Sequence, residues 1–295
     1  MILITGATGH LGKATINSLL NKGVPANEIT ALVRDENKAV ELKEKGVQIK
    51  IGTYNDYESL KNALKGVEKL MLISSNEMVD RLVQHKNVIN AAKENGVKHI
   101  VYTGIDIKSF EQTAIPYVSQ IHKDTADYLN EETDIPYTLL NDTLYAEMIA
   151  LYAGENVLES GIFFPAGDGK SPFVSRTEMG EAAAVVLITP GHEYKEYAIT
   201  ASKAYSFEEI AGMLSEIAGK EVKYHKPDLT TYIEELVKAG VPKENASFLA
   251  GFGTAIAGGE FDTHRSDLET LLGRQPMELQ EFLYVTYGKQ VSEKS

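Results

Sequence analysis

The chain begins with MILITGATGHLG, in which glycines recur at every third residue directly behind a short aliphatic segment. Residues 2–5 are β-branched or aliphatic and predict a strand, and HLGKATINSLLNKG after them has a helical pattern. Glycines at Gly6, Gly9 and Gly12 let the chain turn tightly, expose backbone N–H groups and bring a helix N-terminus close to a phosphate. The opening therefore predicts a βα unit that cradles the pyrophosphate of a dinucleotide.

The spacing of these glycines is GxxGxxG, whereas the commonest dehydrogenases have GxGxxG. The prediction therefore depends on context: a strand, the glycine turn, a helix and a second strand about 30 residues further on. The alternative is a glycine turn in a βα unit that binds no ligand. For the turn we predict cofactor contacts from Gly6, Thr8, Gly9, His10, Leu11 and Gly12.

Short apolar segments alternate with amphipathic stretches through the first half of the chain, as in βαβ units that build a parallel sheet. Gly23, Gly46, Gly66 and Gly96 stand where four of the helices are expected to end on a left-handed residue. We therefore predict an α/β fold, a Rossmann-type doubly wound parallel sheet with a smaller α/β C-terminal substrate lobe. Strands are expected at residues 2–5, 29–33, 47–51, 70–73, 99–102 and 137–140.

After about residue 145 the pattern becomes irregular, with GIFFPAGDGKSPF, a helical RTEMGEAAAVVL, a strand-like EYAITA and a helix-rich tail. We expect a cofactor-binding Rossmann domain at residues 1–150 and a smaller, mainly helical substrate-binding lobe at residues 151–295. Residues 174–200 are expected to pack back on the sheet domain. The final QVSEKS predicts a frayed end.

Composition excludes several classes of partner. The chain has 42 acidic and 29 basic residues, a formal net charge of −13 and no cysteine. This charge repels nucleic acid and anionic lipid, and the basic residues form no patch in the sequence. The seven histidines lack metal-site spacing, so we expect no metal. Without a basic, apolar leader or a membrane-length apolar run, we expect a cytoplasmic protein with no membrane partner.

The end of the second predicted strand distinguishes NADP from NAD. An NAD site usually has an acid there for the ribose 2′-hydroxyl, and an NADP site has a cation for the 2′-phosphate. The sequence at this point is LVRDENKA, in which Arg34 can pair with a 2′-phosphate and Lys38 can add charge. Asp35 could instead serve the ribose, and Arg34 could be a solvated surface charge. We predict NADP, with NADPH preferred over NADH.

Several segments together resemble the NmrA-like branch of the atypical short-chain dehydrogenase/reductases. They are ITGATGHLG, ALVRDENKA, GTYND, VKHIVYTG, DIPYTLL and RTEMGEAAAVVL. Within that family the chain looks like the bacterial NAD(P)H quinone oxidoreductases and triphenylmethane reductases. The resemblance implies an NADPH-dependent reductase that transfers hydride to quinones or to related planar, electron-poor compounds.

Standard members of the wider superfamily carry Tyr-x-x-x-Lys as proton donor and orienting base, and this chain lacks that pair. The corresponding stretch is AIPYVSQIHKDTADYL, where Ser119 precedes Lys123 by four residues and Tyr117 precedes it by six. The resemblance implies that Lys123 or His122 lies by the nicotinamide ribose. The alternative is that both belong to a solvated helix face.

The missing tyrosine affects which substrates the chain can reduce, because substrates differ in how much they need a proton donor. A ketone that accepts hydride becomes an alkoxide, whose conjugate acid has a pKa of about 16, whereas a quinone becomes a phenolate, with a pKa of about 10. The difference of about 6 units is on the order of 8 kcal/mol. A triarylmethane cation needs no proton at all. We therefore expect planar acceptors that stack on the nicotinamide, with the protein supplying mainly position and exclusion of water.

Ligands of a doubly wound sheet bind at the carboxyl ends of its strands. After the fourth and fifth strands we therefore predict contacts from Ser74, Ser75, Thr103 and Gly104, and Asn76 follows in the same loop. Similar reductases often have an acid after the third-strand glycine to contact adenine. Here that position is Thr53, which we expect to bond adenine weakly.

After the sixth strand comes NDTLYAEM, where similar reductases commonly have Arg-Asn-x-x-Tyr. Asn141 and Asp142 depart from that pattern, and Tyr145 matches it. We predict that Tyr145 stacks on or hydrogen-bonds the substrate, with packing between the lobes as the alternative. Phe164, Phe173 and Tyr152 are further aromatic candidates for the same cleft.

Three functions remain open from the sequence. The first is an NADPH-dependent reductase of quinones or dyes, with Lys123, His122 and Tyr145 as candidate catalytic residues. The second is a non-catalytic NADP-sensing regulator of the NmrA type that binds a protein partner. The third is an isomerase or dehydratase of nucleotide-linked sugars, against which Ser119 counts, because that chemistry usually relies on the Tyr/Lys pair. A homodimer is among the possible assemblies.

Overall fold

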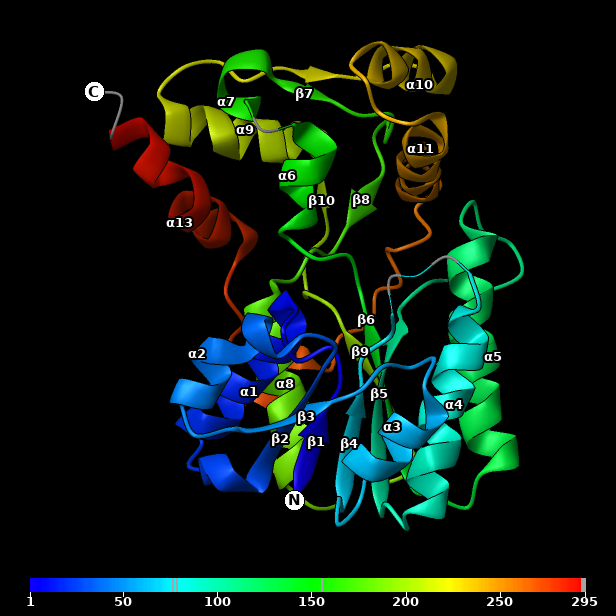
Figure 1. The fold of residues 1–295 in the computed structure, drawn as a ribbon. Helices are drawn as coiled ribbons and strands as arrows, with labels where there is room; N and C mark the ends of the chain where they lie inside the picture. The colour runs from blue at the N-terminus through cyan, green and yellow to red at the C-terminus, as the bar shows by residue number, and fades with distance from the viewer. Residues whose placement is uncertain (76, 78, 155, 293–295) are drawn as a thin grey trace.

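The central element of this computed structural model is a seven-stranded parallel sheet in the order β3-β2-β1-β4-β5-β6-β9 (Figure 1). The structure describes residues 1–75, 77, 79–154 and 156–292, so Asn76 and the last residues of QVSEKS lie outside it. The strands are β1 (Ile2–Ile4), β2 (Ile29–Val33), β3 (Gln48–Ile51), β4 (Lys69–Leu72), β5 (His99–Ile105), β6 (Tyr137–Asp142) and β9 (Lys195–Ile199).

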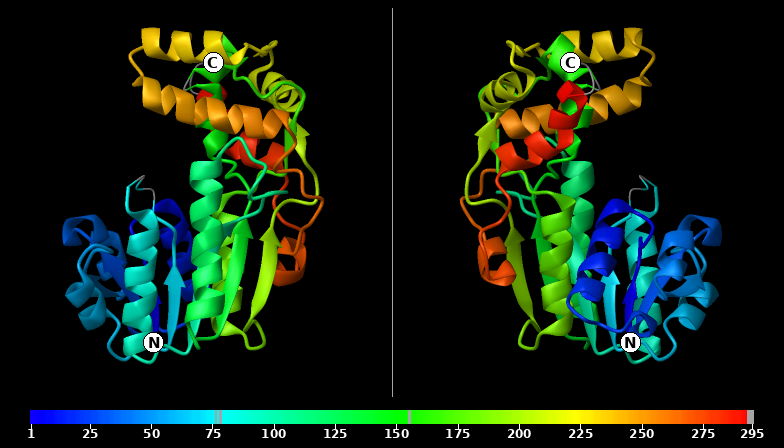
Figure 2. Two further views of the ribbon diagram at one scale, coloured as in Figure 1. Left: turned by 90° about the vertical axis from the view of Figure 1, so that its right-hand side faces the viewer. Right: turned by 90° about the vertical axis from the view of Figure 1, so that its left-hand side faces the viewer.

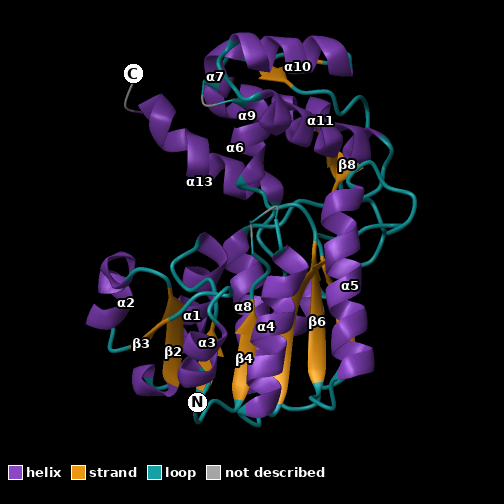
Figure 3. Ribbon diagram, turned by 45° about the vertical axis from the view of Figure 1, so that its right-hand side comes forward, coloured by secondary structure: helices purple, strands orange, loops and turns teal. Residues whose placement is uncertain are grey.

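Helices cover both faces of this sheet, as Figure 3 shows with strands between helical layers. Side chains alternate along each strand, so Ile4 joins the core on the α1 and α8 face and Leu3 joins the core on the α3, α4 and α5 face. The elements of these layers are α1 (His10–Asn21), η1 (Ala26–Glu28), η2 (Glu36–Ala39), α2 (Val40–Glu44), α3 (Tyr57–Ala63), α4 (Arg81–Glu94), α5 (Pro116–Glu132), α8 (Arg176–Ile188) and α12 (Leu268–Leu272).

A second, mainly helical part lies beyond the carboxyl edge of the sheet and gives the molecule an elongated shape (Figure 2). Its aromatic core includes Phe164, Phe173 and Tyr152, and the rings of Tyr152 and Phe164 stack with centroids 4.6 Å apart. These three side chains therefore pack inside this part and do not line the cleft. Its elements are α6 (Met148–Ala153), α7 (Val157–Ser160), β7 (Ile162–Phe163), β8 (Lys170–Ser171), β10 (Tyr205–Ser206), α9 (Phe207–Ala218), β11 (Tyr224–His225), α10 (Leu229–Lys238), α11 (Lys243–Ala257) and α13 (Leu279–Ser292).

The predicted fold class is confirmed, and the strands differ from expectation mainly at their ends. The glycines Gly23, Gly46, Gly66 and Gly96 all have positive φ, between 69° and 86°, as expected for helix ends. β5 and β6 run on to Ile105 and Asp142 because their parallel pairing continues through residues that are not apolar. Both extensions reach toward the second part of the molecule.

The chain crosses between the two parts more than once. It leaves the sheet after β6, returns through α8 and β9, and leaves again into β10 and α9. We keep residues 1–150 and 151–295 as a proposed division, with 174–200 assigned to the sheet domain. Among the described helices, none is long and apolar enough to cross a membrane.

Candidate functional site

A cleft of about 440 Å³ opens at the carboxyl edge of the sheet. Strand order reverses between β1 and β4, and a doubly wound sheet binds its ligands at such a reversal. The lining residues come from the carboxyl ends of β1, β2, β3, β4 and β6, from the segments that follow these strands, and from the start of α8. They are Gly6, Thr8, Gly9, His10, Leu11, Gly12, Leu32, Val33, Arg34, Lys38, Gly52, Thr53, Tyr54, Ile73, Ser74, Ser75, Glu77, Gln84, Tyr145 and Arg176.

The glycine turn is tightly folded against the start of α1. The N–H of Gly9 donates to the carbonyl of Gly6 over 2.9 Å, and Gly6 has a φ of +57°. A Cβ on Gly12 would stand 2.4 Å from the Gly6 oxygen, so only glycine allows this approach. α1 begins without a side-chain cap, which leaves the N–H groups of its first turn for a ligand. This cradle fits a pyrophosphate.

Arg34, Lys38 and Thr53 are three polar residues that line the cleft. Arg34 is 77% exposed, and its Nη1 lies 3.2 Å from Oε1 of Glu77 across the cleft mouth. The carboxylate of Asp35 accepts hydrogen bonds from the N–H and side-chain amide of Asn37 and caps η2. The carboxylate of Asp35 is therefore already hydrogen-bonded to Asn37, whereas Arg34 can exchange Glu77 for an anionic ligand.

Tyr54 is a lining residue that the sequence did not single out. Its hydroxyl hydrogen-bonds Oγ1 of Thr5 over 2.5 Å and the carbonyl of Ile73 over 2.8 Å. The N–H of Ile73 also donates to Thr5 Oγ1. Burial raises the pKa of Tyr54, so it remains a neutral donor that joins the ends of β1 and β4. In the sequence, the one feature that pointed to Tyr54 as a lining residue was its place two residues after the glycine that follows the third strand.

Tyr145, Ser74 and Ser75 also line the cleft. The guanidinium of Arg176, at the start of α8, lies 4.1 Å from the centre of the Tyr145 ring, and Glu147 holds that guanidinium from behind at 3.5 Å. Burial and the nearby Asp142 raise the pKa of Tyr145, so its phenol stays neutral. Tyr145 is thus a stacked ring with a neutral hydroxyl at the edge of the cleft.

Asp142 lies behind this ring at the end of β6. It is buried, and no described residue hydrogen-bonds its Oδ2. Burial raises the pKa of Asp142 well above its ordinary value, against the opposing effect of Arg176.

Thr103 and Gly104 lie outside the lining of the cleft. Thr103 is buried, and its Oγ1 accepts a hydrogen bond of 2.9 Å from the N–H of Ser74. A Cβ on Gly104 would stand 2.2 Å from Oδ1 of Asn141, so the glycine accommodates that side chain. Thr103 therefore supports the lining at Ser74, and direct cofactor contacts for Thr103 and Gly104 remain predictions.

Helix α5 separates the two catalytic candidates that it carries. Lys123 points to the outer surface, where its Nζ lies 2.6 Å from Asp127 Oδ2, and both side chains are more than a third exposed. His122 is buried and turned inward, and Ser119 is also buried. Lys123 is therefore absent from the lining of the cleft, whereas His122 lies one layer behind it.

His122 belongs to a buried polar network between α4 and α5. Its Nε2 lies 3.2 Å from Nη2 of Arg81, and its Nδ1 lies 2.9 Å from the hydroxyl of Tyr102. Since a guanidinium only donates, Nε2 accepts and Nδ1 carries the hydrogen of the neutral ring. Burial and Arg81 lower the pKa of His122 well below its ordinary value. His122 therefore acts as a neutral acceptor that fixes Arg81.

A second histidine completes the network. His85 Nε2 accepts from the N–H of Ser75 over 3.2 Å, and its Nδ1 lies 2.9 Å from Thr125 Oγ1. Burial and the charge of Arg81 lower the pKa of His85 to about 3. The loop after β4 is thus bonded to the neutral imidazole of His85 directly and to that of His122 through Arg81. The sequence held no signal for this, because His85 and His122 lie far apart in the chain.

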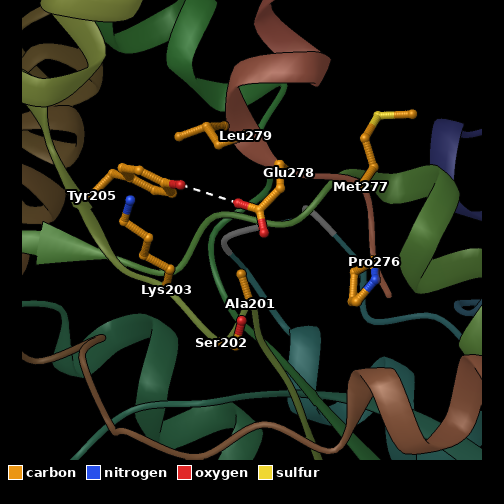
Figure 4. Close-up of a pocket in the computed structure, with 8 residues that line it drawn as sticks. All are labelled: Ala201, Ser202, Lys203, Tyr205, Pro276, Met277, Glu278 and Leu279. Atoms are coloured by element: carbon orange, nitrogen blue, oxygen red, sulfur yellow. Dashed lines mark hydrogen bonds between the residues drawn. The ribbon is translucent and has the colours of Figure 1, made fainter. Parts of the chain in front are cut away.

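A second hollow lies where α13 begins (Figure 4). The hydroxyl of Tyr205 donates to Glu278 over 3.1 Å, and Lys203 lies over the Tyr205 ring. The volume of this hollow is about 10 Å³, which is at the limit for one water molecule. The described residues also form no cluster of ligands for a metal ion.

The reversal of strand order, the glycine turn and the open start of α1 in one cleft define a dinucleotide-binding protein of the doubly wound class. The chain belongs to the NmrA-like family, whose model matches residues 1–283. The predicted resemblance is confirmed.

One curated relative and two solved structures match nearly the whole chain. Quinone oxidoreductase 2 of Escherichia coli is 39% identical over 283 residues, which are 95% of this chain and 96% of the relative. The structure of Citrobacter sp. triphenylmethane reductase with NADP(H) is 38% identical, with a TM-score of 0.88 over 99% of this chain and 100% of that one. The structure of an NADPH-dependent quinone oxidoreductase from Escherichia coli with NADPH is 35% identical, with a TM-score of 0.88 over 100% and 99%.

Proposed function

We propose that this protein is an NADPH-dependent reductase that transfers hydride to quinones or related planar, electron-poor acceptors. One continuous cleft carries the proposal, because the glycine turn, Arg34, Ser74 and Tyr145 all line it. Relatives at 35–39% identity over nearly the full chain are named as reductases of quinones and triphenylmethane dyes. As the charge of −13 and the lack of cysteine suggest, the protein works in the cytoplasm on a small molecule.

The residues of the cleft suit NADPH. The glycine turn and the first N–H groups of α1 hold the pyrophosphate, and Arg34 with Lys38 receives the 2′-phosphate. We assign Thr53 to the adenine end of the cleft and Ser74, Ser75 and Tyr145 to the nicotinamide and acceptor end; all four line the cleft. When bound, NADPH supplies the hydride. The chain itself binds, orients and excludes water from the acceptor.

The side chains near the acceptor suit chemistry without a dedicated acid. Ser119 is buried in α5 and bonds only backbone carbonyls among the described residues, so no hydroxyl replaces the superfamily tyrosine there. Tyr145 presents a flat ring, stacked on one side by Arg176, against which a planar acceptor can lie. Its neutral hydroxyl can donate one hydrogen bond to a carbonyl oxygen of the acceptor.

The test is the consumption of NADPH at 340 nm by the purified protein with 1,4-benzoquinone, 1,4-naphthoquinone, malachite green and a simple aldehyde. Turnover with the planar acceptors and none with the aldehyde supports the proposal. Tight NADPH binding by calorimetry without reduction of any acceptor would instead favour a non-catalytic sensor.

A further inference from the structure

Arg81, the first residue of α4, is a half-buried cation with neutral partners. Its Nε lies 3.2 Å from Oγ of Ser74 and its Nη2 3.2 Å from Nε2 of His122. In the described part of the chain, no carboxylate forms an ion pair with it. A cation withdrawn from water is costly unless an anion compensates it. The position therefore suits a ligand that carries negative charge at some stage of the reaction.

Arg81 lies directly behind the lining of the cleft, at the acceptor end. It bonds Ser74 and acts electrostatically on Tyr145, and both of those residues line the cleft. Because we assign Arg34 to the 2′-phosphate, the two arginines serve different groups.

The surroundings hold this guanidinium in one orientation. His122 is fixed by Tyr102, and Ser74 is fixed through His85 and Thr103. Asp80, immediately before Arg81, has a φ of +58°, a conformation that costs energy for a residue with a side chain. A preorganised cation of this kind stabilises developing charge without having to reorient during the reaction.

Building on the proposed function, we propose that Arg81 stabilises the negative charge that develops on the acceptor oxygen, and thereby favours quinones over cationic triarylmethane dyes. The quinone gains a hydride and becomes the monoanion of the hydroquinone. The nicotinamide loses that hydride and is oxidised. A proton from solvent then completes the hydroquinone, so no protein acid is consumed.

The charge of the acceptor determines whether Arg81 raises or lowers the rate of its reduction. A neutral quinone becomes an anion on the way to product, which a guanidinium attracts in a partly dry site. A triarylmethane dye is a cation that becomes neutral, so the same guanidinium disfavours its binding. Arg81 therefore raises the rate for one class of acceptor and lowers it for the other.

The experiment compares kcat/KM for 1,4-naphthoquinone and malachite green in the wild type, Arg81→Met and Arg81→Lys. Lys93→Met, which removes an exposed charge from the same helix, is the matched control. For Arg81→Met we expect kcat/KM with the quinone to fall about 100-fold, mostly in kcat, as when one oxyanion-stabilising group is removed. With the dye it should stay level or rise. Arg81→Lys should keep the wild-type preference in weaker form, and Lys93→Met should leave both rates unchanged.

NADPH affinity, measured by calorimetry, separates this role from cofactor binding. The dissociation constant should change by less than about twofold in Arg81→Met, and weaker NADPH binding that accounts for the lost activity would overturn the inference. Parallel loss with both acceptors would also overturn it, since that pattern belongs to a structural role. If no variant, including the wild type, reduced any acceptor, the proposed function and this inference would fall together.

Discussion

Arg34 and Glu77 give the sharpest test of the cofactor assignment. In the structure Arg34 pairs with Glu77 at 3.2 Å, and the two side chains are 77% and 47% exposed. A 2′-phosphate must displace Glu77 from the guanidinium. Arg34→Ala should therefore weaken NADPH binding and leave NADH binding nearly unchanged, because NADH has no 2′-phosphate.

The size of the effect follows from the exposure of the pair. Hydrogen bonds to a charged group are worth more than neutral ones, but solvent screens an exposed arginine, so we expect a loss of roughly tenfold to thirtyfold in NADPH affinity. Glu77→Gln frees Arg34 from a surface ion pair and should strengthen NADPH binding by about fivefold at most. Both effects should shrink as salt is raised.

The assay is calorimetric titration of NADPH and NADH into the wild type, Arg34→Ala, Glu77→Gln and the double variant. Lys43→Ala is the control, since it removes a nearby surface charge that pairs with Glu36. In the double variant, the gain from Glu77→Gln should be smaller than in the wild type. Equal losses of NADPH and NADH affinity in Arg34→Ala would refute the assignment.

Two further predictions follow from the glycine turn and the buried network. Gly12→Ala places a Cβ 2.4 Å from the Gly6 oxygen and should lower the free energy of unfolding, measured by urea titration, by about 1–3 kcal/mol. In Gly9→Ala the new Cβ meets only the Gly6 oxygen, at 3.2 Å. This variant should lose less stability but should still bind NADPH more weakly. Equal stability of the two variants would contradict the geometry. The pKa of His85 is about 3 in the folded protein and about 6.5 in the unfolded chain. Between about pH 6.5 and about pH 3 the unfolded chain is therefore protonated at this residue while the folded protein is not, so the free energy of unfolding falls as the pH drops through this range. Urea midpoints should fall from pH 7 to pH 5 by less in His85→Gln than in the wild type, and identical slopes would disprove this.

The sheet and the cofactor end of the cleft could be predicted from local patterns. The glycine turn, Arg34 and the strands are contiguous signals, in which the residue types and their spacing within one βα unit determine the geometry. Strand ends were less predictable, because pairing with β6 carries β5 to Ile105 beyond its apolar run.

The acceptor end could not be predicted in the same way. Arg81, His85, Tyr102 and His122 come from three elements, and only the packing of α4 and α5 on β5 brings them together. Sequence spacing on α5 likewise could not distinguish Lys123, on the outer surface, from His122, which faces inward one residue earlier. Long-range contacts of this kind leave no periodic trace in the chain.

Hydride transfer from NADPH to a planar acceptor is most directly tested by steady-state oxidation of NADPH at 340 nm with 1,4-naphthoquinone, with a simple aldehyde in parallel. We expect saturable turnover with the quinone, a lower rate with NADH, and no turnover with the aldehyde, because the buried Ser119 supplies no acid to an alkoxide. Reduction of the aldehyde at a comparable rate, or firm NADPH binding without quinone turnover, would contradict this account.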